Sequence, residues 1–204
     1  MKIGIVNYGM GNIRSITSAL NYLGIESVNY TSNYEVLNSA DKLILPGVGN
    51  FSEAMRIIEN NKLDKILQEL VLLKEKPILG ICLGMQLLAK SSTEGGYSKG
   101  LGFVDSFVDK FQESLLKIPH VGFNQVCINE ENKMFRGFNH KKIDFYFTHS
   151  YKMTSSNNIG QSMCNYGSDF IASFEIKNIV GTQFHPELSQ TNGLRLLENF
   201  LLHF

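Results

Sequence analysis

The chain of 204 residues has no tryptophan, four prolines and three cysteines. An odd and small number of cysteines does not fit the disulfide framework of a small secreted domain, so we expect free thiols. The chain has no excess of positive or negative charge, since nineteen basic residues balance nineteen acidic ones. A chain without net positive charge lacks the general attraction for nucleic acids and anionic membranes, and neither is an expected partner.

Long apolar segments are also missing. The N-terminal stretch MKIGIVNYGMGN has neither the apolar region nor the cleavage site of a signal peptide, because Asn7 and two glycines interrupt it. Later apolar runs are broken by charged residues such as Lys74 and Lys90 before they reach the length of a membrane span. These absences predict a soluble, cytoplasmic protein.

The residues that are present suit one well-packed domain. Hydrophobic residues make up 43% of the chain, which is long enough for one sizeable core and short for two. No repeat, low-complexity tract or long linker divides the sequence. We therefore expect a single domain over residues 1–204.

Strand and helix patterns alternate over the first ninety residues. Strands are expected at 2–7, 25–31, 42–47 and 77–81, and helices at 12–24, 63–74, 83–90 and after an N-cap at Ser52. This alternation predicts a mainly parallel sheet flanked by helices. From Gly95 onward, short alternating or aromatic runs predict an antiparallel extension, and an amphipathic helix is expected at 191–204.

The stretch GICLG, residues 80–84, has the form of a nucleophile elbow with cysteine at its tip. Glycines on both sides let the chain turn sharply and let substrate approach, and the following helix directs N–H groups and its dipole toward the sulfur of Cys82. Taken alone, the pattern leaves a second interpretation open, in which Cys82 is a small buried residue beside a tightly packed helix.

A partner for the thiol lies about a hundred residues later, in GTQFHPELS. His185 and Glu187 stand two apart in a segment expected to be extended, so both side chains would share one face. The carboxylate could then orient the imidazole and leave its other nitrogen for the cysteine proton, as in a Cys-His-Glu triad. The alternatives are a surface turn and a two-residue fragment of a metal site. Two candidate ligands are too few to hold a metal ion, so no metal is expected.

The pair GICLGMQ and QFHPE resembles the class I, triad-type glutamine amidotransferases. Within that class the chain is most similar to the glutaminase subunits of imidazole glycerol phosphate synthase, through NYGMGNIRS, PGVGNFSEAM, KIPHVGFN, FYFTHSY and NGLRLLENF. The resemblance implies a flavodoxin-like α/β fold without a cofactor. It also implies that glutamine is hydrolysed to glutamate and ammonia through a cysteinyl thioester. The ammonia would pass to a cyclase (synthase) subunit, in a heterodimer of histidine biosynthesis.

The resemblance also implies roles for individual residues. Cys82 would be the nucleophile, His185 the proton carrier and Glu187 the group that holds the imidazole. The oxyanion would be met by the N–H of Leu83 and by one from the loop at Val48 and Gly49. The expected glutamine-binding residues are Gly47, Gly49, Gln86, His149, Ser150 and Tyr151, and the expected partner-facing residues are Asn12, Arg14, Phe123, Tyr146 and Leu188.

Two positions depart from the family pattern. Phe123 stands where tryptophan is common, and Leu188 where lysine is common, both on the expected partner side. An alternative function is therefore a paralogous subunit that supplies ammonia for amidination of a surface-polysaccharide sugar. Two further alternatives are a stand-alone thiol hydrolase and a binding subunit without catalysis.

Overall fold

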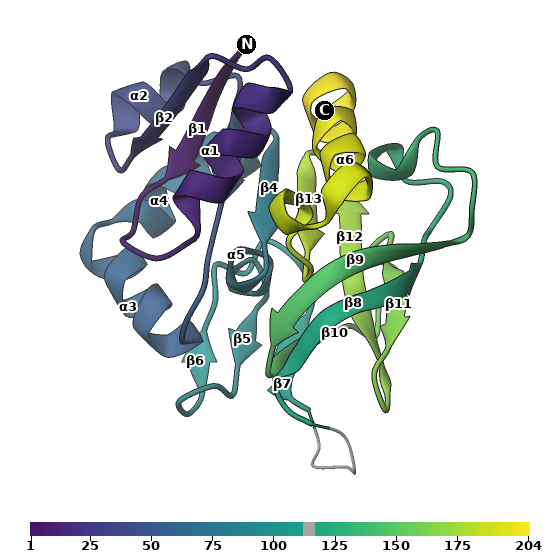
Figure 1. The fold of residues 1–204 in the computed structure, drawn as a ribbon. Helices are drawn as coiled ribbons and strands as arrows, with labels where there is room; N and C mark the ends of the chain where they lie inside the picture. Colours follow the sequence, from purple (N-terminus) through teal and green to yellow (C-terminus); the bar gives the residue numbers. More distant parts are fainter. Residues whose placement is uncertain (112–116) are drawn as a thin grey trace.

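The computed structural model describes residues 1–111 and 117–204. Within these residues thirteen strands form one sheet, whose main path runs β2-β1-β3-β4-β13-β12-β10-β7-β5-β6, while β11 pairs with β12 and β8, and β8 pairs with β9 (Figure 1). The strands are β1 (Lys2–Val6), β2 (Ser27–Thr31), β3 (Lys42–Leu45), β4 (Ile78–Ile81), β5 (Ser91–Ser92), β6 (Ser98–Lys99), β7 (Phe107–Lys110), β8 (His120–Cys127), β9 (Lys142–His149), β10 (Tyr151–Thr154), β11 (Ser162–Asn165), β12 (Asp169–Ile176) and β13 (Ile179–Thr182). The helices are α1 (Ile13–Tyr22), α2 (Tyr34–Ser39), α3 (Phe51–Asn60), α4 (Leu63–Leu67), α5 (Leu83–Leu87) and α6 (Gln190–His203), with a π-helix η1 (Gln68–Leu73) and 3-10 turns η2 (Lys133–Phe135) and η3 (Pro186–Leu188).

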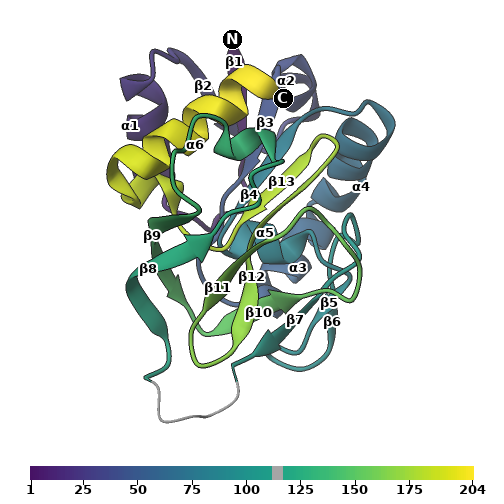
Figure 2. The same cartoon turned by 90° about the vertical axis from the view of Figure 1, so that its right-hand side faces the viewer.

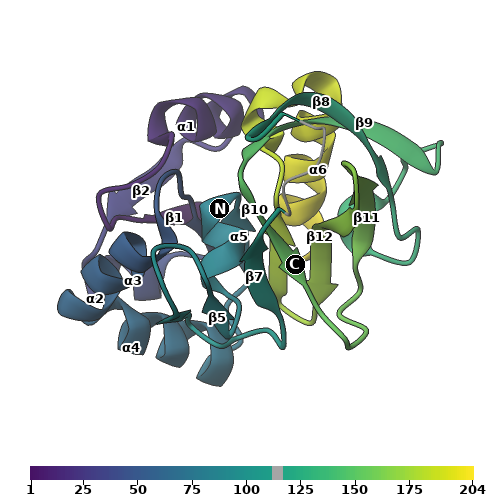
Figure 3. The same ribbon diagram turned by 90° about the horizontal axis from the view of Figure 1, so that it is seen from below.

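Strands β2, β1, β3, β4 and β13 are parallel, as the sequence predicts for this half. Every residue of β3, β4 and β13 is buried, because helices cover both faces of this part of the sheet. Helices α1 and α6 lie on one face, and α3 and α4 lie on the other (Figure 3). Each face has its own apolar cluster, so the parallel half is the middle layer of a three-layer sandwich.

The antiparallel extension is also confirmed. Strands β8 and β9 form a long curved ribbon (Figures 1 and 2), and β9 buries alternate residues, as expected for a strand covered on one face. Phe145 stacks on Phe184 with ring centroids 4.0 Å apart, and Phe147 packs edge-on against the same ring. Phe145 and Phe147 are therefore sheet core, while Tyr146 between them is partly exposed.

Three local expectations are wrong. The N-cap of α3 is Asn50, whose side chain accepts a hydrogen bond from Glu53 N at 3.0 Å, while the Ser52 hydroxyl donates to the carbonyl of Glu94. Helix α5 ends at Leu87, three residues earlier than expected. The segment after His185 is one 3-10 turn instead of extended chain, because Pro186 sits at the first position of a helical turn, which its fixed φ favours.

Register places two distant segments at one edge of the sheet. Strands β4 and β13 are parallel neighbours, with Gly80 opposite Gly181 and Ile81 opposite Thr182. The residues that follow both strands therefore leave the sheet side by side at its carboxyl edge, where open α/β sheets bind ligands. None of the described helices combines the length and the apolar character that crossing a membrane requires.

Candidate active site

Cys82 occupies a strained turn between β4 and α5. Its φ of 53° and ψ of −110° lie where residues with a side chain are rare, which confirms the sharp elbow expected from the sequence. The flanking glycines are required by packing: a Cβ on Gly84 would lie 1.8 Å from the carbonyl oxygen of Leu45, and one on Gly80 would lie 2.8 Å from that of Gly84. The turn thus projects the thiol from the end of the sheet.

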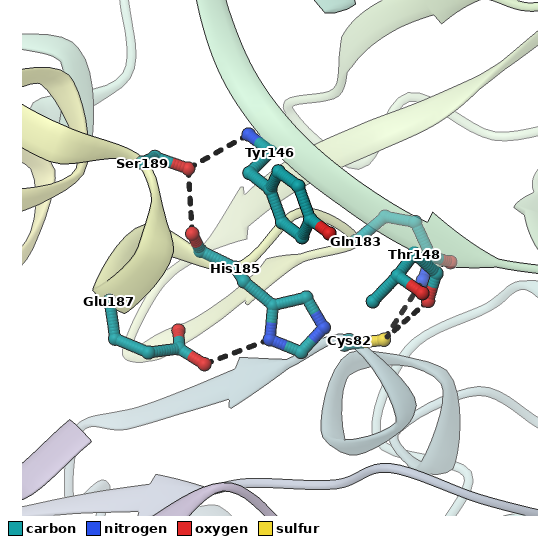
Figure 4. Close-up of polar contacts among 7 residues, drawn as sticks. All are labelled: Cys82, Tyr146, Thr148, Gln183, His185, Glu187 and Ser189. Carbon is teal, nitrogen blue, oxygen red and sulfur yellow. Dashed lines mark hydrogen bonds and ion pairs between the residues drawn. The ribbon is translucent and has the colours of Figure 1, made fainter. Parts of the chain in front are cut away.

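The sulfur of Cys82 is nearly buried, with 6% of the residue exposed. It lies 3.8 Å from the carbonyl oxygen of Thr148 and 3.7 Å from the amide nitrogen Nε2 of Gln183 (Figure 4). In this arrangement the thiol donates to the carbonyl and the amide donates to the sulfur.

His185 and Glu187 are in contact across the η3 turn. Nδ1 of His185 lies 2.8 Å from Oε1 of Glu187, and both side chains are almost fully buried. The other ring nitrogen, Nε2, has no hydrogen-bond partner and points toward the Cys82 sulfur (Figure 4). The carboxylate therefore fixes the proton on Nδ1 and leaves Nε2 available to accept another.

The backbone around His185 is anchored to strand β9. Its N–H donates to the carbonyl of Tyr146 at 2.9 Å, and its carbonyl accepts from the Ser189 hydroxyl at 2.6 Å. The Ser189 hydroxyl in turn accepts from the N–H of Tyr146 at 2.9 Å (Figure 4). This closed loop of hydrogen bonds ties the antiparallel ribbon to the turn that carries the imidazole.

The electrostatics of the site favour a protonated imidazole. Burial alone would lower the pKa of His185, but the charges of Cys82 and Glu187 on its two sides outweigh burial and raise the pKa to about 10. A cationic imidazole beside the sulfur favours the thiolate, which is the nucleophilic form of cysteine.

A cavity of about 320 Å³ opens beside the sulfur. It brings together most of the residues that the sequence nominated for oxyanion and glutamine binding; its lining is Val48, Gly49, Cys82, Leu83, Gln86, Glu94, Pro119, Thr148, His149, Ser150 and Tyr151. Gly47 lies outside this lining, where a Cβ would come within 2.7 Å of the Leu83 side chain. Its role is to let the loop approach α5.

Two backbone segments at the cavity can supply N–H donors. Leu83 begins α5, and the first N–H groups of a helix have no partner within it. Gly49, in the loop that also lines the cavity, has a φ of 120°, a conformation that favours glycine.

Comparison with known proteins identifies the family. A family model described as Glutamine amidotransferase class-I matches residues 4–204. The chain belongs to the class I glutamine amidotransferases. Imidazole glycerol phosphate synthase subunit HisH 1 of Campylobacter jejuni subsp. jejuni serotype O:23/36 (strain 81-176) is 44% identical over 200 residues, which cover 97% of this chain and 98% of the relative. Subunit HisH of Aquifex aeolicus is 42% identical over 98% of this chain and 96% of its own length.

Solved structures agree on the fold of this amidotransferase. One described as a glutamine amidotransferase superposes with a TM-score of 0.75 at 19% identity, over 98% of this chain and 97% of its own. Another glutamine amidotransferase, from Thermotoga maritima, gives a TM-score of 0.66 at 19% identity, over 98% of this chain and 82% of its own. The flavodoxin-like α/β fold expected from the resemblance is confirmed.

The nominated partner-facing residues of the amidotransferase lie at the surface or partly exposed. Phe123 and Tyr146 are paired across β8 and β9, with ring centroids 5.5 Å apart, and Phe123 is 50% exposed. Leu188, in η3, is 38% exposed. Arg14 is exposed on α1, two residues after Asn12, which precedes that helix. The two departures from the family pattern are therefore side chains that solvent reaches.

Three residues of the site were not foreseen as functional. Glu94 is the one carboxylate among the lining residues, and its Oε2 accepts from the N–H of Phe51 at 2.9 Å. Burial raises its pKa despite that hydrogen bond. Gln183 contacts the sulfur, and His120 lies behind His149 with 3.0 Å between their ring nitrogens. Only Gln183 had a sequence signal, since it stands two residues before His185 in the quoted motif.

No cluster of three or more histidine, cysteine, aspartate or glutamate side chains within the described ranges is placed to hold a metal ion.

Proposed function

We propose that this amidotransferase is a glutaminase subunit, which hydrolyses glutamine at Cys82 and supplies the ammonia to a cyclase subunit. The observation that carries the proposal is the strained, cavity-facing Cys82, with the unpartnered Nε2 of His185 directed at its sulfur and Glu187 bound to Nδ1 at 2.8 Å. Nucleophile, base and orienting group stand in the order that thiol acyl transfer needs.

In the first half-reaction the thiol proton already rests on Nε2 of His185, and the Cys82 thiolate attacks the side-chain amide carbon of glutamine. The carbonyl electrons move onto oxygen, and the N–H groups of Leu83 and of the loop at Val48 and Gly49, residues that line the cavity, would meet the negative charge. The carbon–nitrogen bond then breaks, and His185 returns its proton to the leaving nitrogen. Ammonia departs and a glutamyl thioester remains on Cys82.

In the second half-reaction water attacks the thioester. His185 accepts a proton from the water, the carbon–sulfur bond breaks, and glutamate leaves with the hydroxyl oxygen. Glu187 stays ionised throughout and stabilises the imidazolium that forms twice in the cycle.

Substrate recognition falls to the polar lining of the cavity. Glu94 supplies negative charge that matches the α-ammonium of glutamine, while Gln86, Ser150 and Tyr151 supply neutral hydrogen-bonding groups. The hydrogen bonds of His149 are both used inside the protein, one to the Tyr151 carbonyl at 2.7 Å and one to His120. We assign His149 to shaping the cavity wall.

The partner assignment is supported by relatives named as subunits of imidazole glycerol phosphate synthase. The partly exposed apolar side chains of Val121, Phe123 and Leu188 offer a surface for such a partner. Because Phe123 and Leu188 depart from the family pattern, ammonia supply for sugar amidination is the second candidate.

The test is glutamate release from glutamine by the chain alone and by the chain mixed with the histidine-pathway cyclase of its own organism and that cyclase's nucleotide substrate. Strong stimulation by the mixture supports the histidine pathway. Labelling of Cys82 by a glutamine-mimicking electrophile without stimulation would leave the glutaminase standing and favour the sugar pathway. Absence of both labelling and glutamate release would refute the proposal.

A further inference from the structure

A buried amide contacts the Cys82 sulfur, which the Thr148 carbonyl also contacts. Gln183 follows β13, is fully buried, and places Nε2 3.7 Å from the Cys82 sulfur (Figure 4). Its backbone N–H is bonded to the carbonyl of Ala172 at 2.8 Å, so the side chain starts from a fixed point on the sheet.

The orientation of this amide is fixed by a chain of hydrogen bonds that begins at a carbonyl. The carbonyl oxygen of Tyr151 can only accept, so the group of Gln86 that lies 3.0 Å from it must be its NH₂. The same NH₂ lies 2.8 Å from the side chain of Gln183, which must therefore present its oxygen there. The NH₂ of Gln183 is left facing the sulfur.

We propose that Gln183 is a further catalytic residue, whose side-chain NH₂ donates a hydrogen bond to the Cys82 thiolate and holds the sulfur in place for attack. This role rests on the glutaminase function proposed above. A donor at the sulfur strengthens as the sulfur becomes negative, and it weakens when the neutral thioester forms.

The surroundings of the sulfur explain why a donor matters. Its other hydrogen-bonding contact is the Thr148 carbonyl, an acceptor that favours the protonated thiol over the thiolate. Nε2 of His185 makes no hydrogen bond in this arrangement. Gln183 thus adds a neutral donor at the sulfur to the positive charge of His185, and it offsets the carbonyl.

The test measures the rate of Cys82 alkylation by iodoacetamide against pH, by mass spectrometry of the Cys82 peptide, in the full chain. Gln183→Met keeps an unbranched side chain of similar length but has no donor. We expect the midpoint of the rate curve to move up by about one pH unit and the rate at pH 7 to fall about tenfold. Iodoacetamide requires no glutamine, so this outcome stays distinguishable from a failure of the glutaminase assay.

A matched control is available one residue away. Thr182 is fully buried and its hydroxyl has no hydrogen-bond partner, so Thr182→Val exchanges a polar core group for an apolar one without removing a donor to the sulfur. We expect its alkylation curve to match that of the unmodified chain. The exposed Cys127 provides a second control within each sample, since its rate should not change.

A second variant covers the case in which Gln183→Met does not fold. Gln86→Met leaves Gln183 in place but removes the NH₂ that orients it, and we expect a shift in the same direction and about half as large. The proposal is overturned if the folded Gln183→Met protein, or Gln86→Met in its place, keeps the original midpoint, or if Thr182→Val shifts equally.

Discussion

The two halves of the sheet hold their parts of the site by different means. The parallel half holds Cys82 by backbone shape, through a strained φ, the close approach of Gly84 to Leu45 and that of Gly80 to the backbone of α5. The antiparallel half supports His185 and the cavity wall through hydrogen bonds from β9 and β10, such as those of Tyr146 and Tyr151. Backbone constraints leave a pattern in a few adjacent residues, whereas a hydrogen-bond network draws on residues far apart in the chain.

The largest expected effect is loss of the proposed nucleophile, which the parallel half presents. Cys82→Ala should lower glutamine hydrolysis to background, by at least about 10³-fold, since no thioester can form. Steady-state glutamate release measures it. Cys127→Ala, at an exposed position, is the control and should retain full activity. Residual turnover of more than a few per cent in Cys82→Ala would exclude covalent catalysis by this residue.

The next prediction compares the stability cost of a steric contact, at Gly84, with the cost of a strained φ, at Gly122. Gly84→Ala would place a methyl group 1.8 Å from the Leu45 carbonyl, and we expect the free energy of unfolding to fall by about 3 kcal/mol or more. Gly122→Ala, in β8, adds strain at a φ of 128° but meets no atom within 4 Å, so about 1 kcal/mol is expected.

Urea unfolding of both glycine variants supplies the measurement. Gly84 has no positive φ, so equal losses in the two variants would show that the chain shifts enough to relieve the contact with β3.

A third prediction concerns the turn that carries the base. Glu187→Gln keeps the size of the side chain but removes the charge that stabilises the imidazolium, and we expect kcat for glutamine hydrolysis to fall about 100-fold or more with little change in KM. The control is Glu198→Gln, a neutralised carboxylate on α6 that does not line the cavity. A kcat within threefold of the unmodified chain would show that Cys82 alone suffices to charge His185 against the effect of burial.

The sequence predicted the parallel half and the elbow because their determinants are local. The apolar runs at β1, β3 and β4 and the pair Gly80 and Gly84 needed only the residues beside them. Short strands such as β5, β6 and β11 were not foreseen, since two to four residues carry no clear alternation and their pairing depends on distant segments.

The contact between His185 and Glu187 was predicted correctly, but from the wrong local conformation. An extended segment and a 3-10 turn both bring residues two apart within reach, so the pair alone does not distinguish them. Glu94 and His120 escaped prediction for another reason. Neither lies within a motif that signals chemistry, and only the packing of β8 and of the segment after β5 brings them to the site.

The network of the antiparallel half also carries two neutral histidines. Burial lowers the pKa of His120 from an ordinary value of 6.5 to about 4, and that of His149 to about 3. Nδ1 of His149 donates to the Tyr151 carbonyl and Nε2 accepts from Nδ1 of His120, so both rings are satisfied while uncharged. Between pH 6.5 and 4 the unfolded chain binds protons that the folded chain excludes, and stability therefore falls as the pH falls.

The smallest expected effect follows from that difference in bound protons. His120→Gln removes about one of the two protons that these histidines take up on unfolding near pH 5.5, so the slope of unfolding free energy against pH should decrease by about 1.4 kcal/mol per pH unit. Urea unfolding at several values between pH 5 and 6 measures the slope. The pKa of His185 is raised, so its contribution to the free energy of unfolding is lost only as the pH rises above 6.5. It does not affect the slope between pH 5 and 6. An unchanged slope in His120→Gln would mean that His120 binds its proton equally in the folded and unfolded chain, and that burial in the antiparallel half does not keep it neutral.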